Sequence, residues 1–412
     1  MPSFTFLHAA DIHLDSPLRG LSRYEGVPAD EVRGATRSAF DRLIETAIDR
    51  AVDFVVLAGD IYDGDWRDMG TGLYFSAAMG RLGRAGIPVF LLAGNHDAAS
   101  VITKALPALE NVHLFSTRKP TTHRLPHLGV AIHGRSFSDR EVFDNLAVGY
   151  PVADEASFNI GVLHTALGGY AAHARYAPCS EQDLVAKGYD YWALGHVHEH
   201  AILRRDPYIV FPGNLQGRNV REQGPKGAVL VDVEDGHVDA VTHLPLDVVR
   251  WARVEVDVST ASDIDAIHGH VREALRAARD TAADERPLMV RLSLVGQTEL
   301  HGRLQDTTLA MRDDIRSLGA EVSPDLWLEK VEIKTKAQQA DANLLEAGDL
   351  EALLPEADAT LTDMLKAEFG QFLAGVTSAD PDGLVHQAAQ GDWAAVLDVA
   401  ASALRARLGG AR

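Results

Sequence analysis

Three short apolar runs in the first hundred residues each end in a cluster of polar side chains. The runs cover residues 4–10, 54–58 and 87–92, and they are rich in β-branched and aromatic residues. Strands of this kind are buried on both faces of a parallel sheet. Between them, residues 31–51 and 73–85 space their apolar side chains at helical intervals. Strand, helix, strand in this order predicts a layered α/β domain.

Further apolar runs that end in polar residues follow after residue 150. Residues 158–163 and 189–194 form two more apolar runs, and each again ends in polar residues. The runs at 208–211 and 227–233 are separated by Gly and Pro, which indicates antiparallel strands that complete a sheet near residue 245. We therefore place the boundary of the first domain at residue 248.

A second domain is predicted over residues 249–336. Residues 253–258 alternate strictly between apolar and polar side chains, as in a strand with one exposed face. A helix over 261–283, a strand over 288–295, a helix over 299–318 and a strand over 326–333 follow. This order predicts a small α+β domain.

Residues 337–412 are predicted to be a linker and a helical tail. Apolar side chains recur at helical spacing at Leu361, Met364, Leu365, Phe369 and Phe372, and again between residues 393 and 408. Two such helices form a poor core alone, so they either pack on the protein's own body or bind a partner. The tail has 12 acidic and 4 basic residues, which favours a protein partner over nucleic acid.

The composition fits a globular protein, with 46% hydrophobic and 24% charged residues. No apolar run approaches the roughly 20 residues of a membrane span, and the amino terminus does not resemble a signal peptide. We expect a cytoplasmic protein without a membrane partner. The single cysteine, Cys179, excludes an internal disulfide. The net charge of -20 argues against nucleic-acid binding by bulk electrostatics.

The polar clusters at the five predicted strand ends supply metal-ligand chemistry. The candidate ligands are Asp11, His13, Asp60, Asn95, His164, His196 and His198. A single histidine at such a place is more often a structural residue. Seven oxygen and nitrogen donors at strand ends exceed the needs of one ion and match two divalent cations such as manganese, iron or zinc. Two cations at one site can polarise a phosphoryl group and activate water.

These motifs resemble those of the calcineurin-like metallophosphoesterases. The similar segments are Asp11-x-His13, Gly59-Asp60-x-x-Asp63, Gly94-Asn95-His96-Asp97, His164 and Gly195-His196-x-His198. Residues 211–218 and 222–227 are further similar to DNA-repair exonucleases of the SbcD and YhaO type. The resemblance implies a four-layer α/β sandwich with a capping α+β domain and a helical tail.

The resemblance also implies roles for the site residues. One metal would be held by Asp11, His13, Asp60 and His198, and the other by Asp60, Asn95, His164 and His196. His96 would act on the scissile phosphate, with Asp63 hydrogen-bonded to it. Manganese is the expected metal.

The implied function is a two-metal DNA exonuclease that works with an SbcC-like ATPase, and endonuclease activity and a homodimer are both compatible with it. Two rival functions are a phosphatase or phosphodiesterase of other substrates, and a scaffold that regulates an ATPase. Four basic residues are candidate DNA phosphate ligands, with ordinary surface as the alternative: Arg204, Arg205, Arg218 and Arg221.

Overall fold

The computed structural model describes residues 2–16, 29–63, 69–97, 109–168, 176–282 and 284–338, with a few single positions after residue 386. The chain divides into one compact unit of residues 1–252 with 281–290, and a second unit of the remaining residues. The first predicted tail helix, with Leu361, Met364, Leu365, Phe369 and Phe372, lies outside the described residues, and in the second only residues 393, 396 and 399 are described, all three as helix. Among the helices that are described, none is long and apolar enough to cross a membrane.

The first sheet of unit 1 has the strand order β12-β11-β1-β2-β3-β4. Its strands are β1 (Phe4–Ala9), β2 (Phe54–Ala58), β3 (Val89–Leu92), β4 (Val112–Leu114), β11 (Gly227–Glu234) and β12 (His237–Pro245). Strands β1 to β4 are parallel, while β11 runs antiparallel to both β1 and β12. The predicted antiparallel completion of a sheet near residue 245 holds for the run at 227–233, which pairs with β12, but it is wrong for the run at 208–211, which belongs to the other sheet.

The second sheet has the order β5-β6-β7-β8-β10-β9. Its strands are β5 (Thr121–Leu125), β6 (Val130–Gly134), β7 (Phe158–His164), β8 (Tyr191–Gly195), β9 (Ala201–Arg205) and β10 (Tyr208–Phe211). Strands β6, β7, β8 and β10 are parallel, and the edge strands β5 and β9 are antiparallel to their neighbours. The five strands with polar ends are therefore divided between two sheets.

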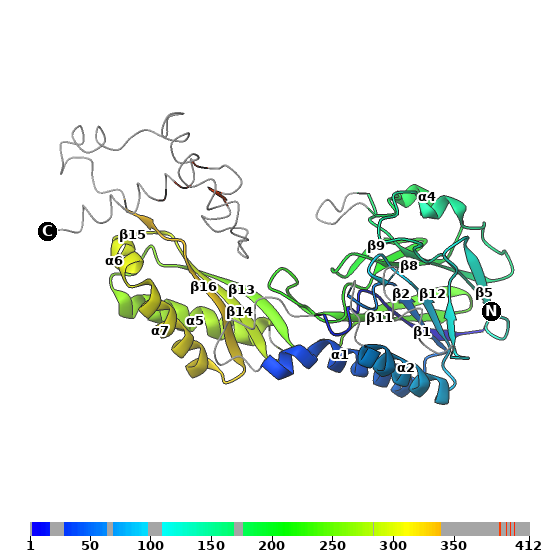
Figure 1. Cartoon of the computed structure of the whole chain (residues 1–412), viewed down its shortest axis with the longest axis horizontal. Coiled ribbons are helices and arrows are strands. Elements are labelled where there is room, and N and C mark those ends of the chain that lie inside the picture. The colour runs from blue at the N-terminus through cyan, green and yellow to red at the C-terminus, as the bar shows by residue number, and fades with distance from the viewer. Residues whose placement is uncertain are drawn as a thin grey trace. The chain divides into compact units, whose positions relative to one another are not determined.

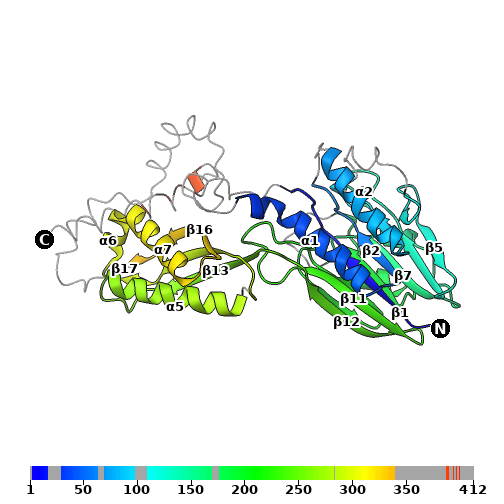
Figure 2. The ribbon, with the colours of Figure 1, turned by 90° about the horizontal axis from the view of Figure 1, so that it is seen from below.

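Strand β2 shows how the layers are held together. Phe54 and Val56 point into an aromatic-rich core shared with the second sheet, whereas Val55 and Leu57 face the opposite core. Helices α1 (Ala29–Asp49) and α2 (Met69–Arg84) cover that outer face, as Figures 1 and 2 show. On the outside of the second sheet, η3 (Leu146–Gly149) and α4 (Glu181–Val185) complete a four-layer sandwich. The predicted fold class is confirmed.

Most of a three-stranded sheet in the order β13-β14-β16 belongs to unit 2, while the first residues of β13 and β14 belong to unit 1. These strands are β13 (Arg250–Asp257), β14 (Leu288–Val295) and β16 (Leu326–Ile333), and a small sheet pairs β15 (Gln297–Thr298) with β17 (Lys336–Ala337). Helix α5 spans Ile264–Ala282. The helix predicted over 299–318 is instead two helices, α6 (His301–Asp306) and α7 (Thr308–Val322), because the backbone leaves helical geometry at Thr307.

Candidate metal centre

The ends of β1, β2, β3, β7 and β8 meet because glycines allow very close approach. A Cβ atom on Gly195 would lie 2.1 Å from the Ala58 carbonyl oxygen and 2.9 Å from His164 Nδ1. A Cβ atom on Gly94 would lie 2.3 Å from Asp60 Oδ1. All three distances are shorter than real Cβ contacts, so only glycine fits at positions 94 and 195, directly before the polar residues.

Four of the candidate ligands have left-handed backbone conformations. The φ angles are 50° at Asp11, 46° at His13, 53° at Asp60 and 101° at His196. Such angles are uncommon outside glycine and cost about 1–3 kcal/mol each. Neighbouring strands impose two of them: the Asp11 N–H donates to the Gly59 carbonyl at 3.0 Å and the His13 N–H to that of Asp60 at 3.0 Å. Strain concentrated at one edge of the sheets supports a functional site there.

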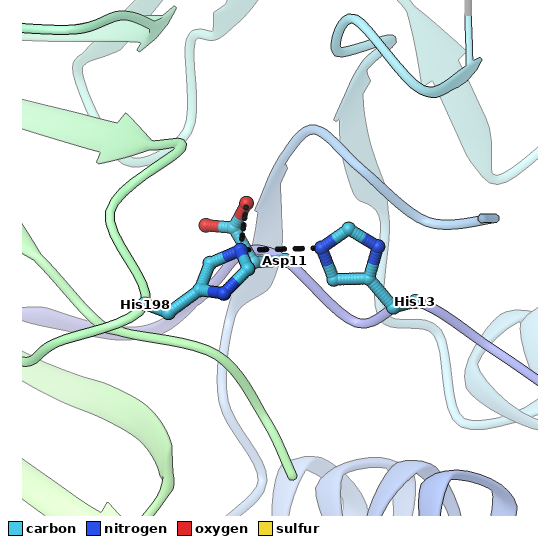
Figure 3. Close-up of side chains that lie close together, drawn as sticks. All are labelled: Asp11, His13 and His198. Carbon is cyan, nitrogen blue, oxygen red and sulfur yellow. Dashed lines mark hydrogen bonds and ion pairs between the residues drawn. The ribbon is translucent and has the colours of Figure 1, made fainter. Parts of the chain in front are cut away.

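The first group of potential ligands is Asp11, His13 and His198 (Figure 3). The Nε2 atoms of His13 and His198 lie 3.3 Å apart, and His198 Nε2 is 3.6 Å from Asp11 Oδ1. The other Asp11 oxygen accepts the His196 backbone N–H at 2.9 Å. Asp11 Oδ1 has no hydrogen-bond partner among the described residues, although it is fully buried. Two imidazole nitrogens and this oxygen thus face one point.

The second group joins His164 and Asp60, with the Asn95 amide beside them. The Ala58 carbonyl lies 2.9 Å from His164 Nδ1 and can only accept, so that nitrogen carries a proton. His164 Nε2 then faces Asn95 Oδ1 at 3.0 Å and Asp60 Oδ2 at 3.4 Å. Three lone-pair donors converge in a buried place, which requires either a proton on Nε2 or a cation.

The two groups that contain Asp11 share that carboxylate, and a third group of converging atoms joins His13 to Asp63 and His96. Asp11 also lies in the group of Asp60 and His164, so the structure places Asp11 in both ligand groups and Asp60 in one. His196 is brought to the site with its ring centroid 5.2 Å from that of His164, but it belongs to neither group of converging ligand atoms. The donor set of carboxylates, imidazoles and one amide fits two divalent transition metals.

Burial and nearby carboxylates act in opposite directions on the two histidines. Burial lowers the pKa of His164, but the opposite effect of the Asp60 carboxylate is larger, and the resulting pKa is about 9. Burial likewise lowers the pKa of His198, while Asp11 and Glu222 raise it to about 9. The carboxylates therefore favour a positive charge at both places, and a metal ion can supply that charge instead of protons.

His96 lies beside the ligands and contacts Asp63. The distance from His96 Nδ1 to Asp63 Oδ1 is 3.2 Å, and the His96 side chain is 31% exposed. Burial lowers the pKa of His96, but the contact with Asp63 and the charge of Asp60 raise it more, so the net shift is upward. The Ser16 hydroxyl donates to the other Asp63 oxygen at 2.9 Å and fixes the carboxylate. His96 can present Nε2 as a proton donor.

Asp97 closes the loop that carries Asn95 and His96. Its carboxylate accepts the backbone N–H groups of Ile61 at 3.1 Å, Tyr62 at 2.9 Å and Gly94 at 3.0 Å. The last residue of the Gly-Asn-His-Asp motif therefore joins the ends of β2 and β3, and it belongs to none of the groups of converging ligand atoms among the described residues.

Glu222 is a site residue that the sequence reasoning did not assign. Its Oε1 accepts from His198 Nδ1 at 2.9 Å and from Arg218 Nη2 at 3.2 Å. Its Oε2 accepts from Asn214 Nδ2 at 2.9 Å and from the Arg218 backbone N–H at 2.7 Å. By holding the proton on His198 Nδ1, Glu222 directs Nε2 toward the metal position. The Glu222-x-Gly-Pro-Lys-Gly segment was the available signal.

The four candidate phosphate-binding arginines occupy different places. Arg218 lies at the site, where its guanidinium pairs with Glu222 and approaches Asp63 Oδ1 at 4.0 Å. Arg221 follows Arg218 closely in the sequence, and its side chain is exposed. Arg204 and Arg205 are at the end of β9 that pairs near Tyr208, which is level with Tyr191 at the start of β8. They are thus roughly 13 Å along the strand from the end that carries His196, and the structure does not bring them to the metal ligands.

A pocket of about 520 Å³ opens over the ligands and His96. It is lined by Asp60, Asn95, His96, Arg140, Glu141, Tyr176, His196 and His198. A larger hollow of about 550 Å³ lies at the opposite ends of the first sheet's strands, around Asp53, Glu110 and His113. It contains none of the candidate ligands, so we place the chemistry in the former pocket.

The fold and the site define a calcineurin-like metallophosphoesterase. The family model described as "Calcineurin-like phosphoesterase" matches residues 4–200, and that described as "Metallophosphoesterase YhaO, middle domain" matches residues 251–336. The chain is 35% identical over 300 residues to the uncharacterized metallophosphoesterase YhaO of Bacillus subtilis, covering 72% of each protein. The chain belongs to this metallophosphoesterase family, and the resemblance stated from its motifs is confirmed.

More distant similarity extends to a repair protein. The chain is 29% identical over 273 residues to the DNA double-strand break repair protein Mre11 of Haloferax volcanii, covering 65% of this chain and 58% of that protein. Among solved structures, TT1561 of Thermus thermophilus matches 58% of this chain and 99% of its own, with 15% identity and a TM-score of 0.34.

Proposed function

We propose that this metal-dependent phosphoesterase is a DNA nuclease that hydrolyses phosphodiester bonds, chiefly as an exonuclease, with two manganese ions. The observation that carries the proposal is the pair of ligand groups sharing Asp11, with His96 beside them and an open pocket above. The similarity to Mre11 repair proteins supports DNA as the substrate.

Some residues of the site would hold the metal ions, and others would act on the substrate. Asp11, His13 and His198 would hold one cation, and Asp60, Asn95 and His164 the other, with His196 adjacent. Two bound divalent cations would supply Lewis-acid polarisation of the phosphoryl group and activation of water at neutral pH.

His96 performs the proton chemistry that the chain itself supplies. Asp63 holds Nδ1 and favours the protonated ring, so His96 stabilises negative charge on the phosphoryl oxygens and donates a proton to the departing oxygen. Arg218, beside Asp63 and Glu222, adds positive charge at the same edge and is the best placed of the four candidate arginines for a DNA phosphate.

The proposal includes a protein partner and a compartment. An SbcC-like ATPase is the expected partner, bound through the acidic tail of residues 337–412, and the protein is expected in the cytoplasm, with a homodimer as its candidate assembly. Co-purification of the ATPase with full-length protein but not with a chain ending at residue 338 is the expected result. Equal recovery with both chains would contradict the partner role of the tail.

The decisive experiment compares substrates on one preparation loaded with manganese. We expect release of nucleotides from duplex and single-stranded oligonucleotides, and loss of that activity in Asp60→Ala. Efficient hydrolysis of 4-nitrophenyl phosphate with intact oligonucleotides would favour the rival phosphatase function. Absence of hydrolysis of every ester by metal-loaded protein would favour the regulatory scaffold.

A further inference from the structure

One wall of the metal pocket supplies neither a candidate metal ligand nor the proton donor His96. It contains Arg140, Glu141 and Tyr176, which line the pocket together with the ligands. The Tyr176 ring centroid lies 6.0 Å from that of His196, with the ring planes at 71°. Phe143 lies beyond it, with ring centroids 6.3 Å apart and the planes at 46°. A line of rings thus leads outward from the metal ligands.

Phe143 is unusual because its side chain is 67% exposed. Exposed large aromatic side chains beside a functional pocket often mark a binding surface, because water contact with such a ring is unfavourable. Every other Phe in the described residues is fully buried or nearly so. The exposure of Phe143 therefore calls for an occupant.

The wall is fixed to the metal centre through backbone hydrogen bonds. The Ala166 N–H, two residues after His164, donates to the Tyr176 carbonyl at 2.9 Å. The Ala177 N–H donates to the Val142 carbonyl at 2.6 Å, which joins the segment of Phe143 to that of Tyr176. The backbone segments that carry the two rings are consequently joined to the strand end that carries His164.

The charges next to the rings suit a nucleotide. The Arg140 side chain has no ion-pair or hydrogen-bond partner within the described part of the chain, so its guanidinium is available to a phosphate. Glu141 beside it carries the opposite charge and would weaken that attraction. A phosphate at the metals, a second phosphate at Arg140 and an aromatic group on the rings together match a polynucleotide strand.

We propose that Tyr176 and Phe143 form a stacking subsite for the base of a nucleotide whose phosphate lies at the metal pocket, with Arg140 contacting a neighbouring phosphate. The inference rests on the proposed nuclease function and specifies its substrate as a nucleic-acid strand with an unpaired base at the site. Every base has an aromatic face, so the subsite tolerates any sequence. It gives phosphodiesters with a base an advantage over those without one.

The test uses two diesters with the same leaving group, thymidine 5′-(4-nitrophenyl phosphate) and methyl 4-nitrophenyl phosphate. The measured quantity is the ratio of their kcat/KM values. We expect Phe143→Ala to lower this ratio roughly tenfold, because base stacking on an aromatic side chain is lost, while Phe143→Trp keeps it. Val148→Ala is the matched control, since Val148 is exposed to a similar extent, 65%, but has no aromatic face on which a base could stack.

Oligonucleotides test the charges. Arg140→Gln should raise KM and reduce the slope of log KM against log salt concentration by about one, whereas Glu141→Gln should lower KM. A ratio that is unchanged in Phe143→Ala, or lowered equally in Val148→Ala, overturns the stacking subsite. If the wild-type protein cleaves oligonucleotides but hydrolyses the thymidine and methyl esters with equal kcat/KM, the stacking subsite is overturned and the nuclease function stands. Wild-type protein that favours the thymidine ester but leaves oligonucleotides intact overturns the nuclease function and keeps the subsite.

Discussion

Glu222 offers the sharpest test of how the chain prepares the metal site. Its two carboxylate oxygens accept four hydrogen bonds, two from His198 and Arg218 on one side and two from Asn214 and Arg218 on the other. Glu222→Gln preserves size and shape but replaces one acceptor oxygen with an N–H₂ donor. Whichever way the amide turns, two donors lose their acceptor and face another donor.

The magnitude follows from these contacts. The Glu222 and Arg218 side chains are 10% and 17% exposed, so the orphaned donors are largely shielded from water. At about 1–3 kcal/mol for each of the two donors, the free energy of unfolding of unit 1 should fall by about 2–6 kcal/mol in Glu222→Gln. Glu222→Ala should in addition weaken binding at one of the two metal sites by roughly 10- to 100-fold, because His198 is no longer oriented.

Urea denaturation and manganese titration measure the two effects separately. Glu155→Gln is the matched control, because Glu155 is exposed, and it should change stability by less than about 0.5 kcal/mol. If Glu222→Ala remains folded and binds both metals with wild-type affinity, His198 is oriented by residues other than Glu222. If Glu222→Gln is as stable as the control, the four hydrogen bonds do not contribute as argued.

Three further predictions concern other residues of the site. His96→Gln should retain two manganese ions, measured by metal analysis, but lose roughly 10²–10⁴-fold in kcat, since proton transfer is removed; loss of the metals instead would make His96 a ligand. Burial lowers the pKa of His164 and His198, but carboxylates raise both to about 9. Their protons therefore stabilise the metal-free fold below pH 6.5, and this contribution disappears as pH rises through 9. Manganese affinity should correspondingly rise from pH 6.5 to 9 and then level off, and titrations showing no pH dependence would contradict the displacement of protons. Asp97→Ala leaves three backbone N–H groups without their acceptor and should cost at least about 3 kcal/mol in denaturation experiments; a stable variant would show that water replaces the carboxylate.

The sequence alone was sufficient for the motif-bearing strands and the family. Residues 54–58 are apolar on both faces, which predicts a doubly buried strand, and Asp60 follows directly at its end. The same logic located the ends that carry Asp11, Asn95 and His164. Chain order and alternation carry this information because a strand's period and its termination are local properties.

Several strands were not predicted, among them the buried central strand β6 and two edge strands with weak local signals. β5 (Thr121–Leu125) alternates between partly buried and exposed positions, and β4 (Val112–Leu114) has only three residues. Both are edge strands, whose side chains are partly in water, so they lack the apolar pattern of central strands. Their identity depends on hydrogen bonds to neighbours distant in the chain.

Only the tertiary structure decided how the strand ends combine. It divided the five ends between two sheets, placed Asp11 in both ligand groups, and brought Glu222 to His198 across 24 residues of sequence. It also separated Arg205 from the site, although the arginine is close to His198 in the sequence. A residue's position along its strand decides how far it lies from the end that carries the site. Pairing between strands decides which residues from distant parts of the chain lie beside it. Neither follows from the local spacing of residues in the sequence.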